Sequence, residues 1–293
     1  MENMKRKPSW LTLPCRKNVN QESVMALLKT FGLNTVCVEA KCPNLAECFE
    51  SKTATFMILG ANCTRNCRFC NVNHGFPEGV DAEEPEKVAL ATKELGLNYV
   101  VVTSVTRDDL EDGGASQFAD TIRALREHWP GTKVEVLIPD FKGDVRALER
   151  VVAAKPDVIG HNVETVPALY EQIRPEAVYG RSLKVIEEIK KLDASRYSKS
   201  SFMVGCGETK EQVLQVMDDL RAVDCDFLTI GQYLAPSKCH YPVQEYIHPD
   251  VFEEFRKIAL MKGFKHVATG PFVRSSYHAK KALNVEEEAH GIH

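Results

Sequence analysis

The chain has 293 residues, 44% of them hydrophobic, and a formal net charge of −4. This size suits one large α/β domain or two small ones, and the lack of a basic balance argues against a nucleic-acid partner. No apolar run approaches the ~20 residues of a membrane span, and residues 1–14 lack the apolar core of a secretory signal. We therefore expect no membrane association and a cytoplasmic location. Ten cysteines in such a chain favour metal binding or redox chemistry over disulfides.

The first marked feature along the chain is a cysteine triplet, Cys37, Cys42 and Cys48, spaced C-x4-C-x5-C. Free cysteines near a helix often behave as small hydrophobes. However, a second triplet follows within about 20 residues, and this makes coincidence a poor explanation. The spacing predicts an iron–sulfur cluster whose fourth ligand comes from elsewhere in the chain.

A second triplet follows the apolar run Ala54–Leu59. Cys63, Cys67 and Cys70 have the spacing C-x3-C-x2-C on a short segment. Three thiolates so placed can hold three irons of a four-iron cluster and leave the fourth iron without a protein ligand. An open iron can bind a small molecule, so the spacing predicts a reaction centre. The aromatic Phe69 is suited to lie against it.

Zinc is the alternative for this segment. Cys63, Cys67 and Cys70 together with His74 would make a closed tetrahedral site. Zinc sites more often combine two separated pairs of ligands, and this triplet does not. The spacing therefore favours a cluster.

From residue 54 onward, short β-rich runs alternate with amphipathic segments. One of these segments places Phe118, Ile122 and Leu125 on one helical face, and Thr209 with Gln212 predicts a capping box. Such repeats predict a parallel sheet, and six units predict a partial (β/α)6 barrel with its chemistry on the loops after the strands. The strand candidates are Ala54–Leu59, Asn98–Ser104, Thr132–Ile138, Asp157–His161, Ser200–Val204 and Asp226–Ile230.

We expect three parts in the chain. Residues 1–53 form an N-terminal extension with the first cysteine triplet, and residues 54–264 form the partial barrel. Residues 265–293 form a C-terminal extension, and the two extensions cover the barrel opening. The acidic run Glu286–Glu288 predicts a disordered tail. The isolated Cys15, Cys206, Cys225 and Cys239 lack ligand spacing, so we interpret them as structural or incidental.

The spacing C-x3-C-x-aromatic-C after a first strand resembles the signature of the radical S-adenosylmethionine (SAM) enzymes. The two triplets together with Arg274-Ser275-Ser276-Tyr277 resemble the lipoyl synthase family more specifically. This resemblance extends over most of the chain and includes the segments 39–44, 103–110, 113–115, 161–165 and 231–234.

The resemblance implies a sulfurtransferase that inserts two sulfurs at carbons 6 and 8 of a protein-bound octanoyl-lysine. It implies SAM and two [4Fe–4S] clusters as cofactors. Cys63, Cys67 and Cys70 would hold the cluster that cleaves SAM, while Cys37, Cys42 and Cys48 would hold an auxiliary cluster. Ser276 would be the fourth ligand of the auxiliary cluster, which is sacrificed as the sulfur donor.

The resemblance also suggests residues that bind the cofactor. Gly113 and Gly114 stand where this class places a loop that recognises the amine of SAM, although Asp-Gly-Gly is also a common turn. Asn162 and Glu164 would bind ribose hydroxyls or, alternatively, cap the next helix. Arg174 would bind a carboxylate or, alternatively, lie in solvent at the surface.

The partners implied by the family are an octanoylated lipoyl carrier domain, a ferredoxin or flavodoxin as electron donor, and an iron–sulfur cluster repair protein. The carrier would be the glycine-cleavage carrier protein or a dehydrogenase E2 subunit. Biotin-synthase-like chemistry is a weaker alternative, because that enzyme takes its auxiliary ligands from barrel strands. A ferredoxin-like electron carrier is weaker still, because a chain of this size is too large for it.

Overall fold

The computed structural model describes residues 6–12, 19–39, 42, 44–50, 55–277 and 279–283. Cys15 and the predicted disordered segment Glu286–Glu288 lie outside the described residues.

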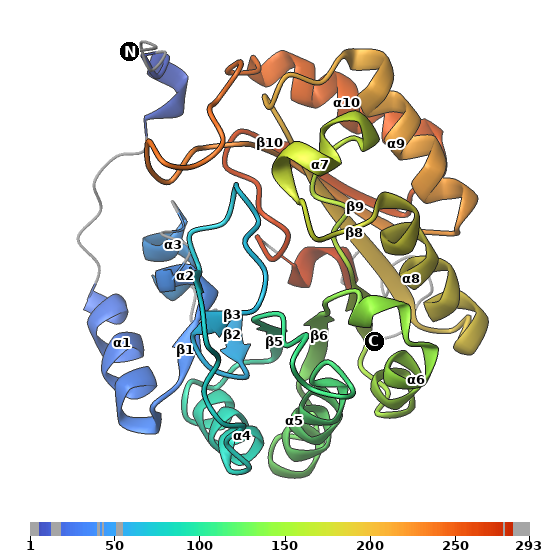
Figure 1. The fold of residues 1–293 in the computed structure, drawn as a ribbon. Coiled ribbons are helices and arrows are strands. Elements are labelled where there is room, and N and C mark those ends of the chain that lie inside the picture. The colour runs from blue at the N-terminus through green and yellow to red at the C-terminus, as the bar shows by residue number, and fades with distance from the viewer. Residues whose placement is uncertain are drawn as a thin grey trace.

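A curved eight-stranded sheet forms the centre of the molecule (Figure 1). Its strand order is β1-β2-β5-β6-β7-β8-β9-β10, parallel from β2 onward, with β1 antiparallel to β2. β3 (Asn62–Cys63) and β4 (Asn73–His74) form a separate two-stranded sheet. The large sheet consists of β1 (Asn34–Thr35), β2 (Thr55–Ile58), β5 (Tyr99–Ser104), β6 (Lys133–Leu137), β7 (Val158–Gly160), β8 (Tyr197–Val204), β9 (Phe227–Gln232) and β10 (His266–Gly270).

All six predicted strands are present, and the partial (β/α) barrel is confirmed. The parallel sheet continues beyond them into β10, which the sequence analysis did not predict. Among the described residues, β10 is not paired with β1 or β2, so the sheet is not seen to close.

Helices cover the outer face of the sheet (Figure 1). The predicted capping box is present, since Thr209 and Gln212 each accept a backbone N–H of the other. The α10 helix begins at Pro249. The outer helices are α4 (Glu84–Glu94), α5 (Ala115–His128), α6 (Val145–Ala153), α8 (Tyr179–Leu192), α9 (Lys210–Ala222) and α10. The α10 helix ends at Met261. The remaining helices are α1 (Val19–Phe31), α2 (Val36–Glu39), α3 (Leu45–Glu50) and α7 (Tyr170–Ile173), with short 3-10 turns at Ser9–Leu11, Phe141–Gly143 and Pro167–Leu169.

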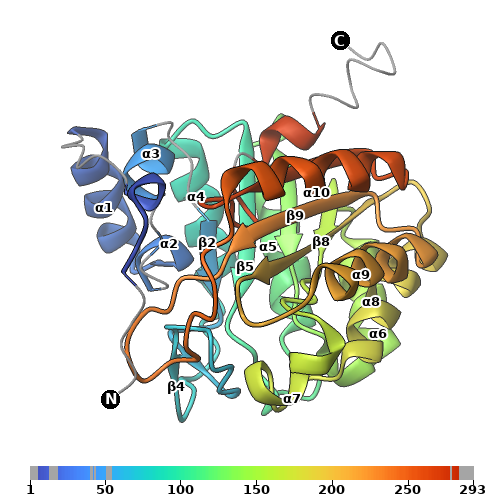
Figure 2. The same ribbon diagram turned by 90° about the horizontal axis from the view of Figure 1, so that it is seen from above.

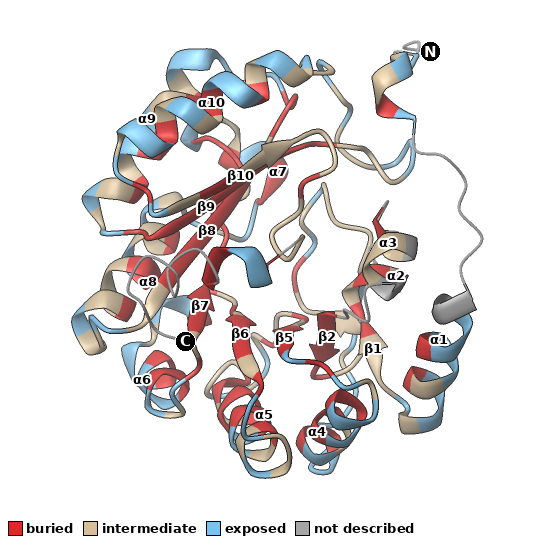
Figure 3. Cartoon of the chain, turned by 180° about the vertical axis from the view of Figure 1, so that it is seen from behind, coloured by how far each residue is buried: buried red, intermediate tan, exposed pale blue. Residues whose placement is uncertain are grey.

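Alternate residues of each strand face the outer helices and the barrel interior. In β5, Val100 and Val102 pack in the same cluster as Phe118 of α5. Tyr99 and Val101, which alternate with these two residues, belong to another hydrophobic cluster, which includes residues 279, 282 and 283 near the C-terminus. β2 and β5 to β9 are largely buried (Figure 3), as expected for strands of a parallel sheet that is covered on both faces.

The barrel interior is partly polar. Lys199 Nζ lies 2.7 Å from Glu135 Oε1, and both side chains are about 95% buried. The Tyr99 hydroxyl donates to the same carboxylate. β8, which carries this inward lysine, begins at Tyr197, three residues before the predicted Ser200.

Both extensions contact the barrel. The ring of Trp10 lies edge-on to His248, with centroids 6.1 Å apart, so the N-terminal extension reaches the segment that leads into α10. In Figure 2, β4 and α7 lie at the same end of the molecule. This is the end where parallel strands finish, and the candidate site lies there.

Candidate active site

The second cysteine triplet lies on the loop between β2 and α4. β3 and β4 form the stem of this loop, with Cys63 in register with His74. The N–H of Thr106 donates to Cys63 Sγ at 3.3 Å, and the N–H of Arg65 does so at 3.5 Å. Such donors stabilise a thiolate that binds metal.

Two other parts of the barrel hold the rest of this loop. The N–H of Arg68 donates to Ile173 O of α7 at 2.9 Å. His240 Nε2 lies 3.0 Å from the carbonyl oxygen of Cys70, so this nitrogen carries the proton and donates it. The sequence analysis did not find a role for His240, because nothing near it in the sequence links it to the cysteines.

Burial dominates the electrostatics of these thiols. It raises the pKa of Cys67, while the positive charge of Arg174 acts in the opposite direction. Burial also raises the pKa of Cys70 to about 12, and the nearby thiols of Cys67 and Cys63 raise it further. The three groups therefore lie close enough to influence one another. Buried thiols of this kind become thiolates readily only when a metal supplies positive charge.

The donor set fits an iron–sulfur cluster. It consists of three soft sulfur atoms on one anchored loop. The described residues include His74, and among them no three or more His, Cys, Asp or Glu side chains converge on a single metal ion. Ligands of one cluster bind different irons, so they need not converge.

Asn162, Glu164 and Arg174 come together beside this loop. Asn162 Nδ2 donates to Glu164 Oε1 at 3.0 Å, and Arg174 Nη1 donates to Asn162 O at 3.0 Å. Arg174 is also close enough to Cys67 for its positive charge to act on the thiol. Burial raises the pKa of Glu164, and Arg174 and Asn162 oppose this shift.

The structure excludes the simpler alternatives for these residues. Arg174 is only 8% exposed, so it is not a surface arginine in solvent. The next turn begins after Val166 without any side-chain cap, so Asn162 and Glu164 do not cap it. Arg174 Nε is buried and has no partner among the described residues, which leaves a donor for a ligand.

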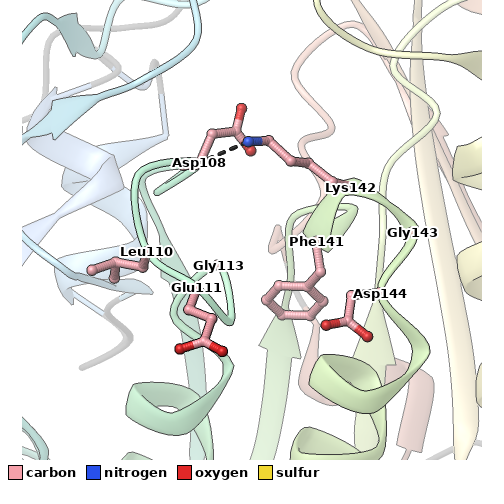
Figure 4. A pocket seen from close by; sticks show the side chains of 8 residues that line it. All are labelled: Asp108, Leu110, Glu111, Gly113, Phe141, Lys142, Gly143 and Asp144. Carbon is pink, nitrogen blue, oxygen red and sulfur yellow. Dashed lines mark hydrogen bonds between the residues drawn. The ribbon is translucent and has the colours of Figure 1, made fainter.

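Gly113 and Gly114 form the turn into α5, with positive φ values of 60° and 90°. A Cβ on Gly114 would lie 2.3 Å from Leu59 Cδ1, so the turn needs glycine there. Gly113 also lines a cavity of about 310 Å³, over which the Lys142 side chain reaches to Asp108 (Figure 4). The turn alternative therefore accounts for both glycines, and their contact with a cofactor remains a prediction.

In the first cysteine triplet, Cys37 lies on α2, Cys48 lies on α3 and Cys42 lies between the two helices. The N–H of Cys42 donates to Cys37 O at 3.1 Å. Burial raises the pKa of Cys48 to about 12, and the thiols of Cys37 and Cys42 raise it further. These three thiols are therefore also close neighbours in a poorly solvated environment.

The Arg274–Tyr277 segment lies against this triplet. Asn44 Nδ2 donates to Phe272 O at 2.6 Å, and the Tyr277 hydroxyl donates to Glu47 Oε1 at 3.0 Å. Ser276 Oγ accepts from Thr55 Oγ1 at 3.1 Å. Residues more than 220 positions apart are thus in contact, and the role of Ser276 as a cluster ligand stays a prediction.

Comparisons with known proteins identify the class first. Residues 57–220 match the radical SAM superfamily. The fold also resembles solved structures of low sequence identity. Streptococcus suis SuiB bound to S-adenosylmethionine has a TM-score of 0.58 at 11% identity, covering 78% of this chain and 53% of that one. HydG, a maturase of the [FeFe]-hydrogenase, has a TM-score of 0.58 at 12% identity, covering 90% of this chain and 67% of that one.

Closer relatives identify the family. A lipoyl synthase of Caldicellulosiruptor saccharolyticus is 59% identical over 96% of this chain and 98% of its own length. A lipoyl synthase of Alkaliphilus metalliredigens is 54% identical over 98% of this chain and 99% of its own length. The chain therefore belongs to the lipoyl synthase family of the radical SAM superfamily.

Membership in this family shows which cofactors the protein uses, namely SAM and [4Fe–4S] clusters. These cofactors favour a cluster over zinc at Cys63, Cys67 and Cys70, and the assignment of these residues stays a prediction. Within the part of the chain that the structure describes, no helix is both long and apolar enough to cross a membrane.

The position of the Arg274–Tyr277 segment depends on Gly231 in β9. A Cβ at Gly231 would lie 2.1 Å from the carbonyl oxygen of Val273, so Gly231→Ala must displace this segment. We expect a loss of stability of about 1–3 kcal/mol. Hydrogen–deuterium exchange should become faster in residues 271–277.

Gly160→Ala in β7 is the matched control. Its Cβ would meet its nearest neighbours, Leu137 Cδ1 and Val136 O, at an ordinary 3.5 Å. It should leave the exchange of residues 271–277 unchanged. Unchanged exchange in Gly231→Ala as well would contradict the contact seen here.

Proposed function

We propose that Cys63, Cys67 and Cys70 hold the cluster that binds SAM in this lipoyl synthase, and that Cys37, Cys42, Cys48 and Ser276 hold the auxiliary cluster. The protein is a sulfurtransferase that inserts two sulfur atoms at C6 and C8 of an octanoyl group carried by a lipoyl domain. When bound, the first cluster supplies the electron that cleaves SAM to a 5′-deoxyadenosyl radical, and the second supplies sulfur.

The contact between residues 44–55 and residues 272–277 carries this proposal. The three thiols of the first triplet need a fourth ligand from elsewhere. Phe272 and Tyr277 are hydrogen-bonded to Asn44 and Glu47, which stand between Cys42 and Cys48 in the sequence. Arg274 is also close enough to Cys42 for their charges to interact. Ser276 lies in this C-terminal segment and offers a hydroxyl oxygen as the fourth ligand.

Serine suits a cluster that is dismantled. Iron in a sulfide cage normally takes soft thiolate ligands, and an alkoxide is a harder ligand that is lost more readily on protonation. The iron bound by Ser276 would therefore be the weakest corner of its cluster. The hydrogen bond from Thr55 would hold the hydroxyl in place before an iron binds.

The residues beside Cys67 would bind SAM. Arg174 offers its free Nε to a carboxylate, while the Asn162–Glu164 pair offers hydrogen bonds to ribose hydroxyls. Phe69 packs against the hydrophobic residues Ile173 and Tyr233. This packing would hold its ring near the thiols of Cys67 and Cys70. Gly113 and Gly114 would leave room for the backbone to approach the amine of SAM.

The substrate is an octanoylated lipoyl domain. We propose that its carrier is the glycine-cleavage protein or a dehydrogenase E2 subunit, and that a ferredoxin or flavodoxin supplies electrons. An iron–sulfur cluster repair protein would restore the consumed cluster. We also propose that the protein works in the cytoplasm.

Replacing the two cysteine triplets should have different effects on SAM cleavage and on sulfur insertion. The anaerobically reconstituted protein should hold about eight irons per chain. Replacing Cys63, Cys67 and Cys70 with alanine should leave about four irons and abolish SAM cleavage. Iron analysis and the assay for 5′-deoxyadenosine measure both effects.

Replacing Cys37, Cys42 and Cys48 with alanine is the matched variant. It should also leave about four irons but retain reductive SAM cleavage while losing sulfur insertion. If both triple variants lost SAM cleavage equally, or if the protein bound zinc, the assignment of the triplets would be wrong.

Ser276→Ala should allow a cluster on three cysteines to assemble but block the release of sulfur. Ser276→Cys should give four thiolate ligands and a more inert cluster, with little or no lipoyl product. Both variants should still bind SAM. Anaerobic mass spectrometry of an octanoyl-lysine peptide distinguishes single from double sulfur addition.

Ser275→Ala is the control and should be milder than either Ser276 variant. Full activity in Ser276→Ala would remove Ser276 from the mechanism.

A further inference from the structure

Arg65 stands inside the C-x3-C segment, and its side chain is buried. Its guanidinium forms a bidentate pair with Asp108, from Nε to Oδ2 at 2.6 Å and from Nη2 to Oδ1 at 3.0 Å. Nη2 also donates to Asp140 Oδ1 at 2.7 Å. The Arg65 side chain is 5% exposed and that of Asp140 is fully buried.

These contacts join three consecutive loops at the carboxyl end of the barrel. Arg65 follows β2, Asp108 follows β5, and Asp140 follows β6. Asp140 is fixed in turn, because it accepts from the N–H of Lys142 at 3.1 Å and from Arg181 of α8 at 3.3 Å. The two arginines balance the two aspartates, so the buried charges are paired.

The same loops hold the two N–H groups that donate to Cys63 Sγ. One belongs to Arg65 itself and the other to Thr106. Thr64 locks the loops together, because its hydroxyl donates to Thr106 O at 2.9 Å and accepts from the N–H of Asp108 at 3.0 Å. A shift of Arg65 would therefore move the cysteine and both of its donors.

We propose that Arg65 is a positioning residue for the SAM-cleaving centre, a three-way clamp that fixes Cys63 and its N–H donors against the loops after β5 and β6. The inference rests on the proposed assignment of that centre to Cys63, Cys67 and Cys70. The clamp requires the planar fork of arginine, because a lysine ammonium cannot reproduce the bidentate pair with Asp108 while also reaching Asp140.

The test uses the complete protein with both clusters. Arg65→Met and Arg65→Lys are compared with the unsubstituted protein by the rate of iron release to a chelator and by the dissociation constant of SAM. Residues that orient metal ligands typically change metal affinity or activity by about 10–100-fold. We expect about half of the iron to leave 10–100-fold faster in both variants, and SAM binding to weaken by about tenfold. The other half of the iron, on the auxiliary triplet, should leave at the original rate.

Arg126→Met is the matched control. Arg126 lies 2.6 Å from Asp157 Oδ2 and also donates to Thr132 O, but these contacts lie at the opposite end of the barrel, where β6 and β7 begin. It should leave iron release and SAM binding unchanged. Asp140→Asn combined with Arg65→Met should add little to Arg65→Met alone, because both remove the same contact.

Three results would overturn the proposal. In the first, iron release and SAM binding stay unchanged in Arg65→Met. In the second, Arg65→Lys behaves like the unsubstituted protein, which would show that only the positive charge of Arg65 matters. Both halves of the iron could also be released equally fast together with a lower unfolding temperature, which would indicate a general structural role. A protein that assembles no cluster on Cys63, Cys67 and Cys70 even without substitution would instead disprove the proposed function.

Discussion

The contact between residues 44–55 and residues 272–277 is the constraint on which the candidate site depends. Asn44 lies within the first cysteine triplet and holds the carbonyl group of Phe272, and Thr55 at the start of β2 holds Ser276. Gly231 in β9 leaves the space that Val273 occupies. The barrel strands thus position the segment that contains Asn44 next to residues 272–276.

The two cysteine triplets are held in different ways. Cys63 lies on a loop whose stem is a small sheet and whose neighbours are the loops after β5 and β6. Cys37 and Cys48 lie on two short helices, and the C-terminal segment completes their surroundings. A loop built into the barrel suits a centre that must survive the reaction. A site assembled from two peripheral segments suits a centre that is consumed and rebuilt.

The hydrophobic pattern of the sequence predicted six strands of the parallel sheet. β5 and β6 begin and end within one residue of the prediction. The pattern was less accurate at the start of β8 and at β10. The start of β8 was missed because the polar residues Ser198 and Lys199 do not continue the apolar run, and β10 was missed because it is short and only partly buried.

Spacing alone predicted the cysteines as cluster ligands, because they are close in sequence. Ser276, Asn162, Glu164 and Arg174 lie far from them in the sequence, and only the family resemblance suggested them; the roles of all these residues stay proposals. Arg65 lies between two of the cysteines, but its partners follow two other strands, and only the folded chain brings their carboxylates to it. Adjacency in the sequence carries no information about such contacts.

The central claim is that the auxiliary cluster on the first triplet gives its own sulfur to the substrate. The most direct test is to reconstitute the protein with heavy-isotope sulfide, remove all free sulfide, and incubate it anaerobically with an octanoyl-lysine peptide, SAM and a reductant. The account predicts a product that carries two heavy sulfur atoms and a yield that stops near one product per chain. A product with unlabelled sulfur, or sustained turnover without any cluster-restoring factor, would contradict it.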